Sequence, residues 1–236
     1  QVNNHQRQEN DSDTRVEKID TASPQLDYDI AIVGGGIIGN TLAVALQNSG
    51  LRVVSIESQS ASISVAKGRA YVISMLSGRI FAGLGIWNQV LPQVTQFSQI
   101  QISDADYAGV VKLYPQDLGT ETLGYAASHE VLLTALQEKL HAAANITVMC
   151  PAQVVGVEYT DTGAEITIQT PDTDRPTTIR ASLVIAADGA KSSLRTQAGI
   201  QTSGWNYWQS CITATIKPEK PHQNIAYERF WYAGPI

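Results

Sequence analysis

The stretch that decides the fold is YDIAIVGGGIIGNTLAVALQNSGLRVVSIE, residues 28–57. Its first six residues form a short apolar, β-branched run, which predicts a parallel strand buried on both faces. After a glycine cluster, apolar residues recur at helical spacing, which predicts a helix that Gly50 stops. A second β-branched run, residues 51–57, follows. Strand, helix and strand in about thirty residues predict a right-handed βαβ unit.

The glycine cluster contains a GxGxxG pattern made by Gly34, Gly36 and Gly39. The pattern lies between the predicted strand and helix, which is the context that a dinucleotide-binding loop requires. Gly34 permits a tight turn, Gly36 lets the backbone approach a pyrophosphate, and Gly39 lets the helix pack closely on the strand. The phosphates are expected at the helix N-terminus, where the dipole favours an anion. A glycine-rich turn without a ligand is the alternative.

An acidic residue, Glu57, ends the second predicted strand, 18 residues beyond Gly39. A carboxylate in this position accepts hydrogen bonds from both hydroxyls of an adenosine ribose, and it repels a 2′-phosphate. An ordinary surface glutamate is the alternative. Together the loop and Glu57 indicate NAD or FAD rather than NADP, and they leave the choice between NAD and FAD open.

The rest of the chain mixes helix and strand patterns. Helices are expected over residues 70–84 and 130–144. Strands are expected over residues 97–103, 110–114, 146–149, 152–159, 164–170, 182–187, 209–216 and 224–231. The first two of these strands are expected to pair antiparallel, and residues 152–170 to form a hairpin. The pattern therefore predicts an α/β fold with an added antiparallel part.

Charge and composition exclude several kinds of partner. Residues 1–29 hold seven acidic and three basic side chains, whereas the rest holds fifteen and thirteen. A nearly neutral folded part offers no basic surface, so nucleic acid is not an expected partner. Residues 1–26 are mostly polar and are expected to form a disordered tail.

No apolar run of about 18 residues and no secretory signal is visible, so a cytoplasmic protein is expected. The two cysteines, Cys150 and Cys211, lie far apart in the sequence and form neither a disulfide framework nor a CxxC metal pair. They are expected to be buried thiols in a reducing compartment. No metal site is expected.

Four later stretches resemble segments of the aromatic-ring-hydroxylating flavoprotein monooxygenases, and within that group the hydroxylases of ubiquinone biosynthesis. They are KGRAYVISMLSGRIFAGLGIW (67–87), LGYAASHEVLLTAL (123–136), VIAADGAKSSLR (184–195) and HQNIAYERFWYAGPI (222–236). The resemblance implies FAD as the cofactor and a Rossmann-like FAD-binding domain with ββα-type additions. That domain is expected over residues 27–95 and 125–200, and an incomplete antiparallel substrate-domain sheet over residues 96–124 and 201–236.

The resemblance also implies which residues bind the cofactor. The three glycines and Glu57 match the FAD-binding loop and the ribose carboxylate, and Arg69 matches an arginine along the flavin pyrophosphate. A guanidinium is well suited to a diphosphate. Asp188 and Gly189 match a motif that helps to bind FAD and the reduced nicotinamide nucleotide. Ser193 and Arg195 complete that pattern, although Arg195 fits a solvated surface charge equally well.

One position departs from the family. Many relatives place a basic residue at the start of the helix after Gly-Tyr, and here only His129 offers that chemistry. A helix cap or surface histidine is the alternative. The remaining expected cofactor contacts are Ile37, Ile38, Ser58 and Val155.

The resemblance implies that NAD(P)H is the co-substrate, that it reduces bound FAD, and that dioxygen is then used to hydroxylate an electron-rich ring. The substrate is expected to be a small aromatic molecule, such as a prenylated phenol or quinone precursor, and a long prenyl tail implies peripheral membrane contact. No side chain stands out as catalytic. The aromatic residues of the last segment fit either a substrate cleft or ordinary sheet packing, and they are Trp205, Tyr207, Trp208, Phe230, Trp231 and Tyr232.

Other functions remain open at this point. A flavin reductase or halogenase uses the same fold, and an NAD dehydrogenase shares the first motif. Relatives carry a second Gly-Asp motif beyond the position where this chain ends, so the chain is expected to be part of a longer enzyme. A non-catalytic FAD- or dinucleotide-binding fragment is therefore a further alternative. The oligomeric state is left open.

Overall fold

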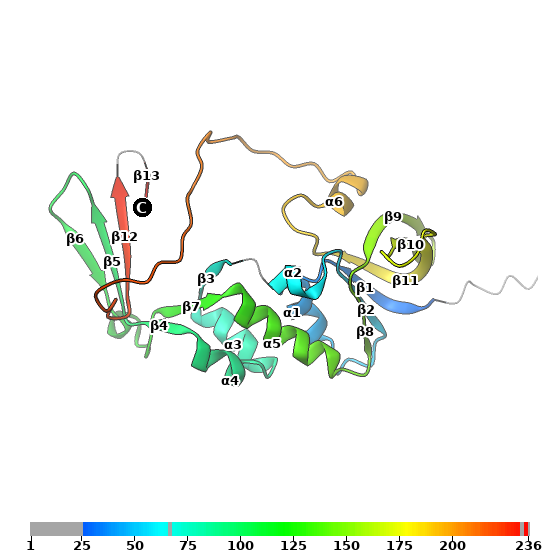
Figure 1. The fold of residues 1–236 in the computed structure, drawn as a ribbon, viewed down its shortest axis with the longest axis horizontal. Coiled ribbons are helices and arrows are strands. Elements are labelled where there is room, and N and C mark those ends of the chain that lie inside the picture. Colours follow the sequence, from blue (N-terminus) through cyan, green and yellow to red (C-terminus); the bar gives the residue numbers. More distant parts are fainter. Residues whose placement is uncertain (1–25, 66–67, 232–233, 236) are drawn as a thin grey trace, which may run out of the picture.

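A six-stranded sheet carries the glycine loop near its centre (Figure 1). The computed structural model describes residues 26–65, 68–231 and 234–235. The predicted tail, apart from Leu26, therefore lies outside the described residues. The strands, in spatial order, are β8 (Ile146–Met149), β2 (Val53–Ile56), β1 (Tyr28–Val33), β11 (Thr177–Ala186), β10 (Gly163–Gln169) and β9 (Gln153–Thr160).

The first four strands of this sheet are parallel, and the last two are antiparallel to their neighbours. β1 pairs parallel with both β2 and β11, and β2 pairs parallel with β8. β10 pairs antiparallel with β11 and with β9, which confirms the predicted hairpin. The parallel pairing of β1 and β2 around helix α1 (Ile37–Ala45) is the arrangement that the βαβ pattern predicts.

Hydrophobic side chains of β1 point alternately into two separate cores, because successive side chains of a strand face opposite sides of the sheet. Ile32 joins a cluster with Val44 of α1 and Leu136 of α5 (His129–His141). Ala31 and Val33 join a second cluster formed with β10 and β11. The prediction of a strand covered on both faces is confirmed.

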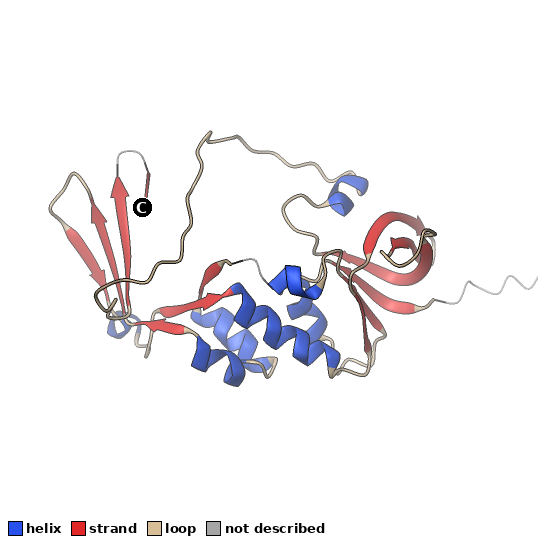
Figure 2. Ribbon diagram, viewed as in Figure 1, coloured by secondary structure: helices blue, strands red, loops and turns tan. Residues whose placement is uncertain are grey.

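Short helices and two smaller sheets complete the structure (Figure 2). The other helices are α2 (Ala61–Val65), α3 (Met75–Gly83), α4 (Trp87–Val90), α6 (Ser193–Gln197) and the 3-10 turns η1 (Leu91–Gln93) and η2 (Pro115–Leu118). One sheet has the order β3 (Ala70–Ile73), β7 (Gly124–Ser128), β4 (Thr95–Phe97). The other has the order β13 (Gly234–Pro235), β12 (Ile225–Trp231), β5 (Gln99–Asp104), β6 (Val110–Leu113). Figure 2 shows most of the helices between this last sheet and the six-stranded one.

The predicted helix over residues 70–84 is wrong in its first part. Residues 70–73 form β3, which pairs antiparallel with β7, and only α3 is helical. Ser74 separates the two elements because it is the N-cap of α3. Its backbone is extended, and its hydroxyl oxygen accepts a hydrogen bond from the Ser77 N–H. Leu76, in the second position of α3, is 66% exposed.

Two other boundaries differ from the prediction. α1 ends at Ala45, several residues before Gly50, because the Leu46 N–H bonds to the Ala43 carbonyl and tightens the last turn. The strand expected over residues 182–187 is the second half of the longer β11, and its Leu183 is exposed. By contrast, the strands expected near residues 97–103 and 110–114 are largely confirmed, since β5 and β6 pair antiparallel.

The four-stranded sheet is mixed rather than purely antiparallel. β5 pairs antiparallel with β6, but β12 pairs parallel with β5. β12 reaches the sheet through the long connection after α6, which lets it arrive in the same direction as β5 (Figure 1).

The strand expected over residues 209–216 is absent from the described structure. A strand exists through hydrogen bonds to a neighbour, and the connection between α6 and β12 runs without one. Ile212 is accordingly 96% exposed. Trp205, Tyr207, Trp208, Phe230 and Trp231 are exposed as well, so core packing does not account for them, and Tyr232 lies outside the described residues.

The expectation of two buried thiols is also wrong. Cys211 lies on the same extended connection and is exposed, and Cys150 is half-buried. Within the part of the chain that the structure describes, no helix has the length and apolar character needed to cross a membrane.

Replacing Leu136 by alanine tests which core holds the helices to the sheet. Leu136 is fully buried, so Leu136→Ala should lower the free energy of unfolding by about 2–5 kcal/mol through lost burial and a residual cavity. Leu76→Ala, on the exposed side of α3, is the matched control and should change it by less than about 0.5 kcal/mol. Urea denaturation of both variants checks this, and equal losses would contradict the packing described above.

Candidate functional site

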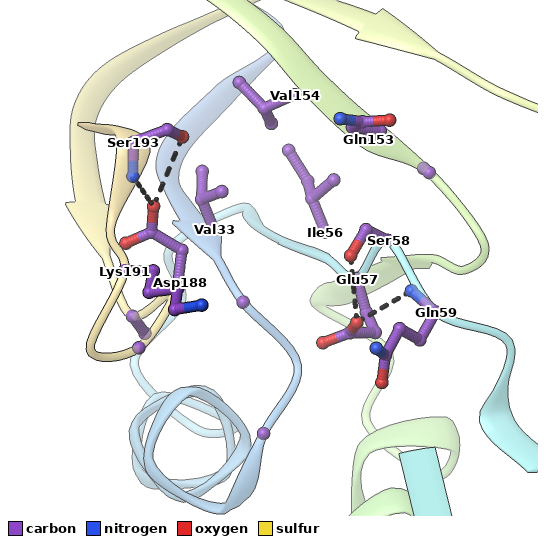
Figure 3. Close-up of a pocket in the computed structure, with 15 residues that line it drawn as sticks. Val33, Ile56, Glu57, Ser58, Gln59, Gln153, Val154, Asp188, Lys191 and Ser193 are labelled. Carbon is purple, nitrogen blue, oxygen red and sulfur yellow. Dashed lines mark hydrogen bonds between the residues drawn. The ribbon is translucent and has the colours of Figure 1, made fainter. Parts of the chain in front are cut away.

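The candidate site lies where three parallel strands end at one edge of the sheet. Gly34 follows β1, Glu57 follows β2, and Asp188 follows β11. All three line one cleft with a volume of about 370 Å³. In α/β sheets, ligands bind in such a crevice beyond the carboxyl ends of the strands. Figure 3 shows Glu57 and Asp188 on opposite sides of the cleft, with Val33 and Ile56 between them.

The glycine loop is packed too tightly for side chains at two of its positions. A Cβ atom on Gly34 would lie 2.3 Å from the Ala187 carbonyl oxygen, and the φ of Gly34 is +113°. A Cβ atom on Gly39 would lie 1.9 Å from the Gly34 carbonyl oxygen. Because these two glycines carry no side chain, the start of α1 can lie close to the end of β1 and to the turn after β11.

Gly36 is different, because it leaves open space rather than filling it. It is the N-cap of α1, no side chain caps the helix there, and a Cβ atom on it would meet nothing within 4 Å. The first amides of a helix lack partners inside the helix, and its dipole favours an anion at this end. The loop therefore fits the diphosphate of a dinucleotide such as FAD.

The Glu57 carboxylate is held by backbone N–H groups on both of its oxygens. Oε2 accepts from the Gly35 N–H at 2.7 Å, and Oε1 accepts from the Gln59 N–H at 2.8 Å. The hydroxyl of Ser58, an expected cofactor contact that also lines the cleft, lies 3.4 Å from Oε1. The role of Gly35 as a hydrogen-bond donor was not foreseen, although its place in the GGG run was visible in the sequence.

The Asp188 carboxylate caps the short helix α6 from the other side of the cleft. Its Oδ2 accepts from the backbone N–H groups of Ser193 at 2.9 Å and Leu194 at 3.3 Å, while its Oδ1 is buried without a hydrogen-bond partner. Burial raises the pKa of this carboxyl, but hydrogen bonds from a neighbouring serine hydroxyl and from backbone N–H groups outweigh it, so the pKa lies below its ordinary value.

Several cleft residues were not identified from the sequence. Lys191, in the turn after Asp188, adds a cationic side chain to the lining, and Gln59 and Gln153 add amides. Lys191 lies two residues after the Asp188-Gly189 pair, and this position in the sequence could have identified it as a cleft residue. Gln153 and Val154, at the start of β9, line the cleft, whereas the expected Val155 is half exposed and does not.

The structure does not bring every expected residue to the cleft. Gly34, Gly36, Glu57, Ser58, Asp188, Gly189 and Ser193 line it. Ile37 packs against the helical core, Ile38 is exposed, and Arg69 is exposed just before β3. Arg195 lies in a neighbouring hollow of about 430 Å³, where its guanidinium donates to the Ala190 carbonyl.

His129 is neither a helix cap nor a surface residue, so that alternative is wrong. It is 4% exposed, and the N-cap of α5 is Ser128. Both of its ring nitrogens lie within hydrogen-bond distance of protein atoms, the Tyr71 hydroxyl and the Ser64 carbonyl. Its side chain therefore faces the protein interior rather than the cleft.

The thiol nearest to the site is not an activated nucleophile. Burial raises the pKa of Cys150, and the nearby Glu57 charge raises it further. Its Sγ lies 3.1 Å from the Gln59 carbonyl oxygen, to which the thiol donates. Within the described residues, no three metal-ligating side chains gather into a site.

The fold and the cleft define a dinucleotide-binding protein of the α/β class, with a glycine loop after the first strand, a carboxylate after the second and a later Asp-Gly turn. The sequence matches the FAD binding domain family over residues 27–232, and the chain belongs to that family. The predicted resemblance and the predicted cofactor class are thereby confirmed.

The curated relatives include hydroxylases of ubiquinone biosynthesis. The chain is 40% identical to an uncharacterised protein of Synechocystis sp. over 89% of this chain and 50% of that protein. It is 32% identical to 3-demethoxyubiquinol 3-hydroxylase of Escherichia coli (88% and 53%), and 29% identical to ubiquinone hydroxylase UbiL of Rhodospirillum rubrum (92% and 50%). The chain thus spans about half the length of these relatives.

Solved structures with the same fold include monooxygenases. Similar structures are p-nitrophenol 4-monooxygenase of Pseudomonas putida (TM-score 0.64, 21% identity, 72% of this chain and 43% of that one) and the flavin-dependent monooxygenase PieE with FAD and substrate (0.62, 23%, 74% and 33%). At these identities the likeness concerns the fold, and it confirms the predicted α/β fold class.

Asp188→Asn tests the cap that this carboxylate makes. Because the folded-state pKa lies below the ordinary 3.8, the charged form stabilises the fold above that pH, and the stabilisation is lost as the pH falls through the folded pKa. The variant loses the negative charge near the N-terminus of α6 and should therefore be less stable than the wild type at neutral pH, by roughly 0.3–1 kcal/mol, and the difference should shrink in acid. Urea midpoints across this range check it.

Asp161→Asn, on the exposed turn between β9 and β10, is the control for charge removal alone. It should leave the midpoint nearly unchanged at each pH. A stability difference for Asp188→Asn that grew on acidification would contradict the cap.

Proposed function

We propose that this chain is the FAD-binding part of a monooxygenase that hydroxylates an aromatic ring with NAD(P)H and dioxygen. The single observation that carries the proposal is that Gly34, Glu57 and Asp188, from three separate parts of the sequence, line one cleft. A family match to an FAD binding domain and relatives named as a ubiquinone hydroxylase and a 3-demethoxyubiquinol 3-hydroxylase support it.

The chain's own residues divide the work of holding the cofactor. The backbone N–H groups at the start of α1, next to Gly36, would bind the diphosphate. The Glu57 carboxylate would accept hydrogen bonds from the hydroxyls of the adenosine ribose. Lys191 lines the cleft and supplies positive charge for the phosphates. Arg69 is exposed and outside the cleft lining, and its assignment to the same phosphates rests on the family resemblance. Asp188, Gly189 and Ser193 bound the cleft on the far side. When bound, FAD supplies the redox chemistry, and the protein supplies position and exclusion of water.

The substrate follows from the relatives rather than from the cleft. Proteins named as ubiquinone hydroxylases act on a prenylated ring, so we propose a prenylated phenol or quinone precursor and a peripheral contact with the membrane that holds it. The proposed division assigns residues 27–95 and 125–200 to FAD binding and residues 96–124 and 201–236 to a partial substrate domain. The exposed aromatic side chains of the latter are available to line an apolar site.

Titration of the chain with FAD tests the proposal, and Gly36→Ala makes the test specific. Flavin fluorescence should be quenched as FAD binds. Because a Cβ atom on Gly36 would project into open space, Gly36→Ala should change the free energy of unfolding by less than about 1 kcal/mol. The same methyl would occupy the place of the diphosphate, so the FAD dissociation constant should rise at least about tenfold, which is about 1.4 kcal/mol.

Gly83→Ala is the matched control, because Gly83 ends α3 away from the cleft and also leaves open space around a Cβ atom. It should leave the FAD dissociation constant within about twofold of the wild-type value. Absence of FAD binding by the folded wild-type chain would overturn the proposal, and so would unchanged binding by Gly36→Ala.

The reaction itself separates the monooxygenase from a flavin reductase or halogenase on the same fold. The longer protein that contains this chain should consume NADH or NADPH faster when a prenylated phenol is added. When the dioxygen is isotopically labelled, the label should appear in the new hydroxyl group on the ring. Mass spectrometry of the product checks this. Nucleotide consumption without labelled product would favour the reductase, and a halogenated ring in the presence of halide would favour the halogenase.

A further inference from the structure

One buried histidine contacts the chain before, at and after Arg69. His129 is the first residue of α5, and its backbone N–H donates to the Arg69 carbonyl at 2.7 Å. Its Nε2 lies 2.8 Å from the Ser64 carbonyl oxygen in α2. Its Nδ1 lies 3.0 Å from the Tyr71 hydroxyl in β3. Figure 1 shows α2 and β3 along the same side of α5, so a single residue joins these three elements.

The hydrogen-bond partners define the tautomer of the neutral ring. A carbonyl oxygen only accepts, so Nε2 must carry the hydrogen that is donated to Ser64. In the neutral ring Nδ1 then accepts from the Tyr71 hydroxyl. Both ring nitrogens are satisfied although the side chain is almost fully buried, and loss of either partner would leave a buried polar atom unpaired.

The start of β3 is also held by its strand pairing. Ala70 is opposite Ser128 and Tyr71 is opposite Ala127 in the antiparallel ladder with β7. The rings of Tyr71 and His129 lie 5.8 Å apart and are tilted by 52°. Arg69 itself, directly before this ladder, is exposed. Its backbone is therefore fixed against α5 while its guanidinium points to solvent.

We infer that His129 is a positioning residue for Arg69 in FAD binding, not a contact with the cofactor. His129 fixes α2 and the start of β3 on either side of Arg69, so the guanidinium is presented to the FAD phosphates from a fixed backbone. A group held in place before binding loses less conformational entropy when the ligand arrives. This inference rests on the proposed function, because it requires Arg69 to contact FAD.

A double-mutant cycle on the FAD dissociation constant of the chain tests the inference. Arg69→Ala should raise this constant about tenfold, because a phosphate contact is lost. His129→Gln keeps a donor and an acceptor but loses their positions on the ring and the ring packing, and it should raise the constant about three- to tenfold. If His129 acts through Arg69, the double variant should bind FAD no more than about twofold more weakly than Arg69→Ala alone.

A second variant and a ligand-free measurement make the test independent of how well His129→Gln folds. Tyr71→Phe keeps the ring in place and removes only the hydroxyl that donates a hydrogen bond to His129 Nδ1. It should raise the FAD dissociation constant about twofold to fivefold. Without FAD, trypsin should cleave after Arg69 several-fold faster in Tyr71→Phe and His129→Gln than in the wild type, because the start of β3 is less firmly held.

His141→Gln is the matched control. His141 lies at the other end of the same helix, is exposed, and its Nδ1 bonds within α5 to the Gln137 carbonyl. The substitution should leave the FAD dissociation constant within about twofold of the wild-type value and the cleavage rate unchanged.

The possible failures of the two proposals are distinguishable. If the wild-type chain binds FAD and Arg69→Ala weakens binding, but Tyr71→Phe and His129→Gln bind as the wild type does, the role of His129 is wrong and the FAD-binding function stands. The positioning role is also overturned if the two fold-increases in the FAD dissociation constant multiply in the double variant. It is overturned as well if Arg69→Ala binds FAD as the wild type does. A wild-type chain that binds no FAD overturns both proposals.

Discussion

The close approach of Gly34 to the turn after β11 is the constraint on which the site depends. The Ala187 N–H donates to the Val33 carbonyl at 2.7 Å, and the space beside Gly34 is filled by the Ala187 carbonyl. A side chain at position 34 would push these two turns apart. Because the turns meet, the glycine loop from the start of the domain and Asp188 from its end bound the same cleft.

Two carboxylates of the cleft, Glu57 and Asp188, are held by backbone N–H groups rather than by arginine or lysine. Gly35 and Gln59 donate to the first, and Ser193 and Leu194 donate to the second. These N–H groups hold both carboxylates in defined orientations without an ion pair to a neighbouring cation. Lys191 and the amides at the N-terminus of α1 are then left for an anionic ligand. This arrangement of charge agrees with a nucleotide that carries a diphosphate between a ribose and a ring system.

Local patterns predicted most of the six-stranded sheet and failed where an element depends on a distant partner. The β1–α1–β2 unit was predictable because its strand runs, glycine cluster and helix lie side by side in the sequence. Residues 70–73 looked helical together with α3, and only pairing with β7, far along the chain, makes them a strand. Residues 209–216 have the alternation of a strand but have no neighbouring strand in the described structure. The parallel pairing of β12 with β5 was likewise invisible in either segment alone.

By itself, the sequence determined the glycine loop and its acidic partner Glu57, because these depend on spacing within about thirty residues, and the resemblance of four later stretches indicated the flavoprotein class. Only the tertiary structure decided that Gly35 holds Glu57, that Val154 rather than Val155 lines the cleft, and that His129 turns inward. These outcomes depend on which side chains from distant segments meet in space. Side-chain direction and burial are set by the packing of whole elements, and short-range periodicity does not encode that packing.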